Sequence, residues 1–331
     1  MLGRLLLTIC FSTTAFAQSS SSNIKVAVSE VIVPVTVTDD KGKFVTNLDK
    51  TDFKILEDGK EQTIEYFSRE KQQPVVAGFL LDLSNNSRLH WKTYQEAARE
   101  LVWTVLPGEK KYSGYLIGYH TEPELLVNTT TDSDVIAEKI MKLKPSGGAA
   151  LYDSIYIACT SRNLVKGEPI EPRRVVIIIG DGHDNASKKS IEEVLELAQR
   201  NLITIYGIST VAFGFTVEGE KNLTRLAEET GGRVEYPLQG LYKDVSGYLS
   251  TPSDEGNYAL KVGTGGYASE ISKGIFTAIA NVSGEITTQY VLRYISNRTD
   301  TGKVFRKIEV KVPSLPTVKI RARRGYYPFN P

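Results

Sequence analysis

The chain of 331 residues is long enough for two domains, or for one large core with an addition. Its composition is ordinary for a globular protein, and a formal net charge of +1 gives no electrostatic reason to expect nucleic acid or an acidic membrane surface. We therefore predict that its partners do not include nucleic acid.

The first residues differ from the rest of the chain. Met1-Leu2-Gly3-Arg4 is a short basic start, residues 5–11 are apolar, and Ala15-Phe16-Ala17 is a small-x-small cleavage signal. We interpret residues 1–17 as a secretory signal peptide, with a buried helix or a membrane anchor as alternatives. No apolar run here or later is long enough to span a bilayer. The sequence therefore predicts an exported protein without a membrane span, in the periplasm, on the cell surface or outside the cell.

A serine-rich spacer at residues 18–23 leads into a first β segment, residues 24–72. Valines alternate with other residues from Val31 to Val37, and Glu57-Asp58-Gly59-Lys60 is typical of a turn between strands. A meander of this size is too small to be stable alone, so it requires another sheet to pack against.

Strand and helix patterns alternate through residues 73–284. Two dense apolar runs end abruptly in Asp82 and Asp181, as buried strands of a parallel sheet do. Shorter strands are expected at residues 112–119, 125–127, 202–208 and 233–236. Helices are expected at residues 91–106, 132–142, 149–163, 190–201, 220–230 and 267–282. This alternation predicts a doubly wound, mainly parallel α/β sheet with helices on both faces.

Strand patterns return in residues 285–331, at residues 289–295, 303–312 and 317–323. The β segments at the two ends of the chain are each incomplete. We therefore expect residues 24–72 and 285–331 to pair into one β-sandwich, in which the α/β domain is inserted or which flanks it.

Asp82 and Asp181 end two different strands. Because the carboxyl ends of parallel strands meet at one edge of a sheet, we expect the two carboxylates to lie close together at that rim. With the hydroxyl of Ser84 they form a set of hard oxygen donors, which favours magnesium, manganese or calcium over zinc or copper.

Several stretches resemble a von Willebrand factor type A domain. They are Asp82–Asn86, Gly147–Asp153, Asp181–Asp184 and Leu223–Gly232. Three flanking stretches resemble a group of secreted bacterial proteins with this domain, abundant in Acidobacteria. These are Val35–Asp39, Asp52–Gly59 and Arg324–Tyr327. The resemblance covers nearly the whole mature chain and implies the fold described above.

The resemblance also implies a metal-ion-dependent adhesion site. Such a site combines an Asp-x-Ser-x-Ser loop, a threonine and a further aspartate around a cation that binds an acidic side chain of a partner protein. Asp82, Ser84 and Asp181 match this pattern, whereas Asn86 replaces the second serine and Ala149 stands at or beside the threonine position. An asparagine carbonyl can still bind a hard cation, but alanine offers no donor, so water would have to replace it. The implied ligand set for Mg²⁺, or Mn²⁺ or Ca²⁺, is Asp82, Ser84, Asn86 and Asp181; the alternative is a site that has lost its metal.

Residues around the same rim are candidates for contact with a partner. They are Ser87, Ala149, His183, Phe213 and Tyr248. Aromatic side chains on loops around a site often anchor partner proteins. The alternatives are a helix cap at Ser87, an ordinary loop histidine at His183, and aromatic groups that pack on the domain itself.

Two further carboxylates in these loops have simpler interpretations. We expect Asp153 to hold its loop through hydrogen bonds, and Asp184 to be a solvated loop residue or a helix cap. We favour these roles over metal ligation for both residues.

Enzyme signatures are weak. There is no Gly-x-Ser-x-Gly motif, Cys159 lies within an apolar helical pattern, and Gly263-Thr264-Gly265-Gly266 matches neither phosphate-binding fingerprint. We predict a non-enzymatic, secreted protein-binding module. The first alternative is a metal-free scaffold or interaction module of the same fold, and the second is a hydrolase in which a cation activates water.

Overall fold

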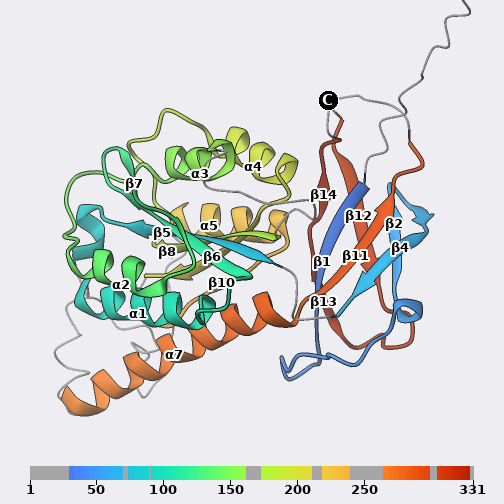
Figure 1. Cartoon of the computed structure of the whole chain (residues 1–331), viewed down its shortest axis with the longest axis horizontal. Helices are drawn as coiled ribbons and strands as arrows, with labels where there is room; N and C mark the ends of the chain where they lie inside the picture. Colours follow the sequence, from blue (N-terminus) through green and yellow to red (C-terminus); the bar gives the residue numbers. More distant parts are fainter. Residues whose placement is uncertain are drawn as a thin grey trace, which may run out of the picture.

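The computed structural model describes residues 30–69, 74–88, 91–161, 173–210, 218–238, 264–298 and 304–328. The predicted signal peptide and spacer lie outside these residues, as do Phe213 and Tyr248. Figure 1 shows an α/β domain on one side and a β-sandwich on the other, with one long helix leading from the first into the second.

The α/β domain is built on a six-stranded sheet with the order β10-β9-β8-β5-β6-β7. All neighbouring strands are parallel except β7, which runs antiparallel to β6 at one edge. The strands are β5 (Val75–Asp82), β6 (Tyr112–Tyr119), β7 (Pro123–Thr130), β8 (Arg173–Gly180), β9 (Thr204–Ser209) and β10 (Val234–Glu235). Strand β5 lies at the centre and is buried along its whole length, which explains its unbroken apolar sequence.

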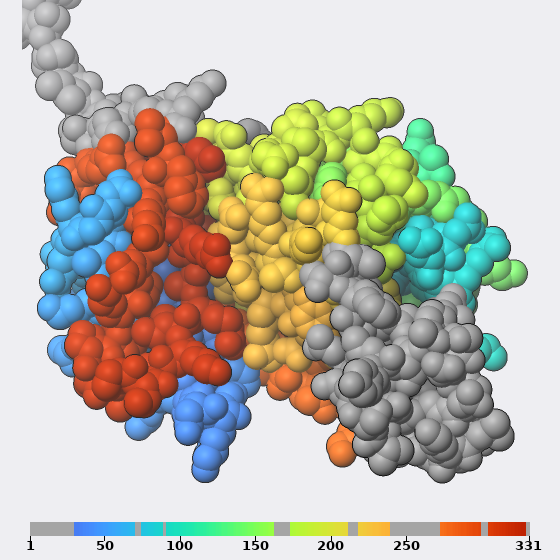
Figure 2. Space-filling model, turned by 180° about the vertical axis from the view of Figure 1, so that it is seen from behind, coloured from blue at the N-terminus to red at the C-terminus, as the bar shows by residue number. Residues whose placement is uncertain are grey.

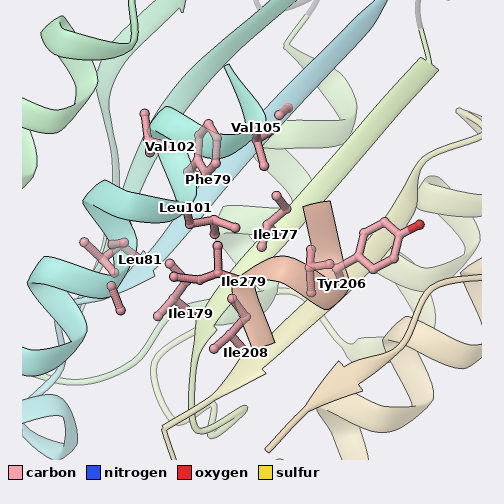
Figure 3. Packing of buried hydrophobic residues seen from close by; sticks show 14 of the residues in the cluster. Phe79, Leu81, Leu101, Val102, Val105, Ile177, Ile179, Tyr206, Ile208 and Ile279 are labelled. Atoms are coloured by element: carbon pink, nitrogen blue, oxygen red, sulfur yellow. The ribbon is translucent and has the colours of Figure 1, made fainter. Parts of the chain in front are cut away.

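Helices cover both faces of this sheet. One layer consists of α1 (Trp91–Val105), α2 (Ser133–Met141) and α7 (Thr264–Thr288). The other consists of α3 (Leu151–Thr160), α4 (Ile191–Arg200) and α5 (Glu218–Thr230). Alternate residues of β5 serve the two layers: Phe79 and Leu81 pack with Leu101 of α1 and Ile279 of α7 (Figure 3), whereas Leu80 faces the opposite layer.

The sandwich combines strands from both ends of the chain. Its two antiparallel sheets have the orders β13-β1-β11-β4 and β14-β12-β2-β3. The N-terminal strands are β1 (Glu30–Thr38), β2 (Lys54–Glu57), β3 (Lys60–Gln62) and β4 (Ile64–Ser68), with a 3-10 turn, η1, at Lys50–Asp52. The C-terminal strands are β11 (Tyr290–Ile295), β12 (Arg306–Lys311), β13 (Lys319–Ala322) and β14 (Gly325–Tyr326). Residues such as Val33, Ile55, Leu292 and Ile308 form their common core. The predicted fold class is confirmed.

The last helix is longer than the sequence pattern predicts. It was expected to end at Val282, but α7 continues to Thr288, so that β11 begins at Tyr290. The added turns are fixed by tertiary contacts: Glu285 is fully buried and its carboxylate lies 2.7 Å from Arg321 Nη2 and 3.4 Å from Arg233 Nε. Such distant ion pairs leave no periodic signal in the sequence.

The sandwich packs directly on the α/β domain. In the view from behind, residues 304–328 lie against the part of the surface formed by α5 (Figure 2). Here Arg324 Nη2 lies 2.7 Å from Glu228 Oε2, and the Arg200 guanidinium lies 4.6 Å from the centre of the Tyr327 ring. Within the described ranges, no helix combines the length and apolar character required to cross a membrane.

Candidate functional site

The rim of the central sheet brings two of the predicted site carboxylates together. Strand β5 ends at Asp82, and its neighbour β8 ends at Gly180, directly before Asp181. Asp82 is only 2% exposed, whereas Asp181 is partly exposed. The expected arrangement at the carboxyl edge therefore follows from the pairing of two parallel strands.

Asp82 is held by the loop that follows it. Its Oδ1 atom accepts a hydrogen bond of 2.8 Å from the backbone N–H of Ser84, and its carbonyl oxygen accepts one of 2.9 Å from the Ser87 hydroxyl. Within Asp82 and this loop, two oxygens are buried without a hydrogen-bond partner among the described residues: Asp82 Oδ2 and Ser84 Oγ. Buried oxygens of this kind are rare because each one costs free energy, so these two atoms mark the place where a ligand or water would bind.

The same environment makes the carboxyl group of Asp82 difficult to ionise. Burial, and then the nearby negative charge of Asp181, raise the pKa of Asp82 from its ordinary value of 3.8 to about 6. The Ser84 backbone N–H acts in the opposite direction. The positive charge of a cation at this position would offset both effects by favouring the ionised carboxylate.

Tyr119 is a further member of the rim that sequence reasoning missed. It ends β6 and is paired in register with Asp82. A Cβ atom at Gly180 would clash with the Tyr119 hydroxyl oxygen and lie 3.3 Å from Asp82 Oδ2, so glycine allows the two strand ends to lie this close. Burial raises the pKa of Tyr119 well above its ordinary value, and the hydroxyl stays protonated beside the carboxylate. The sequence predicts a strand that ends at Tyr119. Placing this residue beside Asp82 also requires the register of β6 against β5, which the sequence does not reveal.

Asn86 and Asp181 contact each other. The exposed Asn86 donates from Nδ2 to Asp181 Oδ2 at 3.3 Å, and the His183 backbone N–H donates to Asp181 Oδ1 at 2.8 Å. Asn86 thus presents its amide nitrogen to the carboxylate. Rotating the amide by half a turn would present the oxygen, which is favourable only with a cation between the two groups. The exposed His183 makes its contact through the backbone.

The second loop offers no side-chain ligand at the expected position. Ala149 is only 1% exposed, and its backbone N–H donates to Asn185 Oδ1 at 2.8 Å. The N–H of Gly148 donates to Thr121 Oγ1 at 3.0 Å. Asn185 and Thr121 were not identified from the sequence because both lie in loops whose pairing depends on the tertiary fold. These bonds tie the loop to the loops that follow β6 and β8, but the Ala149 methyl group cannot bind a cation.

The remaining polar residues of the rim hold loops in place. Asp153 accepts hydrogen bonds of 3.0 Å from the backbone N–H groups of Lys188 and Lys189. Asp184 accepts one of 2.9 Å from the Tyr152 N–H at the start of α3. Both carboxylates therefore act as loop and helix anchors, as expected. Ser87 is buried, and its hydroxyl donates to the carbonyl oxygen of Asp82, so this side chain does not face solvent.

The ligand types present at the rim limit what it could bind. Across the described ranges, no group of three or more His, Cys, Asp or Glu side chains is placed to hold a metal ion. A cation here would depend on hydroxyl, amide and water oxygens in addition to the two carboxylates. Magnesium accepts such a mixed set because it retains several waters.

An open, mainly parallel sheet covered on both faces is the architecture of an α/β domain, in which ligands generally bind at the carboxyl edge of the strands. Residues 77–236 match the family model of the von Willebrand factor type A domain, and the α/β domain has the fold of that family. Such domains generally mediate protein–protein interaction.

Solved structures with similar folds come from several bacteria. A von Willebrand factor type A protein from Catenulispora acidiphila is 12% identical, with a TM-score of 0.42, covering 75% of this chain and 51% of that chain. The vWF domain of a type V pilus tip protein from Porphyromonas gingivalis is 21% identical, with a TM-score of 0.30 and coverage of 34% and 39%. An aerotolerance-related membrane protein from Bacteroides fragilis is 15% identical, with a TM-score of 0.39 and coverage of 60% and 99%. This chain thus spans less than two thirds of the first two proteins. No curated protein matches it.

The raised pKa of Asp82 predicts a pH-dependent stability in the presence of chelator. Because the folded-state pKa of about 6 exceeds the ordinary value of 3.8, the folded protein binds this proton more tightly than the unfolded chain. The contribution is complete below pH 3.8 and is lost as the pH rises through 6, which lowers the free energy of unfolding by about 3 kcal/mol. Urea unfolding between pH 4 and 8 measures this loss.

The variant Asp82→Asn lacks the ionisable group, so its stability should change less over this range, and it should be more stable than the original protein at pH 7.5. Asp40→Asn, at an exposed turn, is the matched control and should keep the original profile. Identical profiles for Asp82→Asn and the original protein would contradict the assignment.

Proposed function

We propose that this chain is an exported, non-catalytic protein-binding module that captures an acidic side chain of a partner protein through a divalent cation at the rim. The observation that supports the proposal is the pair of buried, unpartnered oxygens, Asp82 Oδ2 and Ser84 Oγ, next to the carboxylate of Asp181. A cation bound there would supply a positive charge with an open position for the partner's carboxylate. The proposed ion is Mg²⁺, with Mn²⁺ or Ca²⁺ as substitutes.

Several residues of the rim would provide ligands for the ion. Asp82 and Ser84 provide oxygens from the rigid end of β5, and Asp181 provides a carboxylate from the neighbouring strand. Asn86 would contribute its oxygen after the amide rotates away from its present hydrogen bond. Since ionised Asp82 is required, binding would release a proton near or below pH 6.

A metal-free module of the same fold is the competing function. The Asp181 carboxylate already accepts hydrogen bonds from Asn86 and from the His183 N–H, and Ala149 leaves one ligand position to water. These features favour a rim that functions without a cation. The two functions differ in one measurable property, which is the affinity for divalent ions.

Calorimetric titration of Mg²⁺, Mn²⁺ and Ca²⁺ into the mature chain at pH 7.5 tests the proposal. We expect saturable binding that is abolished in Asp82→Ala, because the central carboxylate is lost. Binding should be preserved in Asp40→Ala, which removes an exposed carboxylate from a turn of the sandwich. No binding heat and no shift in melting temperature with any of the three ions would establish the metal-free alternative instead.

The same titration can test whether Ala149 weakens the site. Ala149→Thr restores a hydroxyl, and Ala149→Val has nearly the same shape without it. We expect Mg²⁺ to bind the threonine variant about tenfold more tightly than the valine variant, as one added oxygen ligand allows. Equal affinities would show that this position does not face the ion.

Export and partner binding can be tested in the source organism. The predicted signal peptide supports export, and the flanking stretches support membership of the secreted group abundant in Acidobacteria. We expect the mature protein to begin at Gln18 and to retain an envelope protein on a column, with release by chelator and recovery on adding Mg²⁺. Capture that is unaffected by chelator and by Asp82→Ala would exclude a cation-dependent contact.

A further inference from the structure

A small cavity lies at the seam between the α/β domain and the sandwich, at the end of the sheet opposite to Asp82. It has a volume of about 30 Å³ and is lined by the starts of β8 and β9, by β1 and β11, and by the segment after β13. Four of its lining residues are arginines, Arg173, Arg174, Arg293 and Arg323, and none is an aspartate or a glutamate. We call it the seam cavity.

Arg323 brings the most deeply buried charge to this cavity. The residue is 2% exposed, and its Nη2 atom donates a hydrogen bond of 3.0 Å to the backbone carbonyl of Leu202. Its Nε atom is buried and has no hydrogen-bond partner among the described residues. Burial lowers the pKa of Arg323 to about 10, so the side chain is still positively charged at neutral pH.

Arg173 approaches the cavity from the α/β domain. Its guanidinium donates to the carbonyl oxygen of Ile286 at 2.8 Å and to Gln289 Oε1. Gln289 in turn donates to the Tyr206 hydroxyl at 2.9 Å. All of these acceptors are neutral. Arg173 Nε, like Arg323 Nε, is buried without a partner in the described part of the chain.

Two carboxylates near the seam already have partners, and neither of them contacts Arg323. Arg293 Nη1 lies 3.4 Å from Glu30 Oε1, and the Glu30 side chain is about half exposed. Glu285, whose charge acts on Arg173, is paired with Arg321 and Arg233 as described above. A buried guanidinium with neutral acceptors alone is costly, and proteins normally pair such charges. Among the described residues, Arg173 and Arg323 therefore have only neutral hydrogen-bond acceptors.

We propose that the seam cavity binds a small inorganic anion of the size of chloride, which bridges Arg173 of the α/β domain and Arg323 of the sandwich. The volume supports this class of ligand, because a space of about 30 Å³ holds the centres of only two or three water-sized groups, roughly 10–15 Å³ each. The anion would join the two halves of the molecule. This site is independent of the function proposed for the rim.

Thermal unfolding in gluconate and in chloride at equal ionic strength tests the proposal. We expect 100 mM chloride to raise the melting temperature by about 5 °C relative to gluconate, since a ligand that binds only the folded state stabilises it. Arg323→Gln should lose this response. Arg324→Gln is the matched control, because Arg324 is the next residue but its side chain is exposed and paired with Glu228, so the response should be kept.

Bromide provides a second measurement that does not depend on a variant. Crystals of the full mature chain soaked in bromide should show an anomalous scattering peak between Arg173 and Arg323. Equal melting temperatures in the two salts, a chloride response that persists in Arg323→Gln, or a seam cavity without a bromide peak would each overturn the proposal. The chloride response should also persist in Asp82→Ala with chelator, so the rim and the seam can fail separately.

Discussion

The structure depends on the burial of β5 up to its last residue. A strand that is buried on both faces, with a parallel neighbour on each side, has no place for a charge except at its ends. Asp82 occupies such an end, where low solvation and the charge of Asp181 raise its pKa to about 6. The polar rim is therefore a direct consequence of the apolar core behind it: the core places the carboxylate rigidly and also makes its charge unfavourable without a compensating ligand.

The sandwich extends this rigidity to both ends of the chain. Strand β11 follows α7 after a single residue, Gln289, whose side chain donates to Thr36 in β1 and to Tyr206 in β9. One amide thus links the last helix, the first strand and the central sheet. Because β1 also pairs with β13, neither terminal β segment can form its sheet without the other. Pairing between the two terminal segments therefore closes the sandwich in Figure 1, and the hydrogen bond from Gln289 to Tyr206 ties it to the α/β domain.

The sequence predicts most of this architecture, and the reasons for its failures are physical. Strand and helix periodicity identified the doubly wound sheet, and the rule for parallel strands brought Asp82 and Asp181 together. Tyr119 was missed because its role depends on the register of β6 against β5, which no local pattern encodes. Likewise, the end of α7 depends on the pairing of Glu285 with distant arginines. The loop at Ala149 depends on a hydrogen bond to Asn185, which lies in a separate loop. Each failure concerns contacts between residues far apart in sequence.

Charged residues lie at both ends of β8. The strand begins at Arg173, in the seam cavity, and Asp181 follows its last residue at the rim. Between its second residue, Arg174, and Asp181 its side chains are apolar and buried, so charge is confined to the strand ends. A core built for stability alone would be better served by apolar residues at such partly or fully buried positions, since unpaired buried charges are costly. The buried carboxylate at one end of the central sheet and the buried guanidiniums at the other are therefore explained together, as parts of two proposed binding sites of opposite charge.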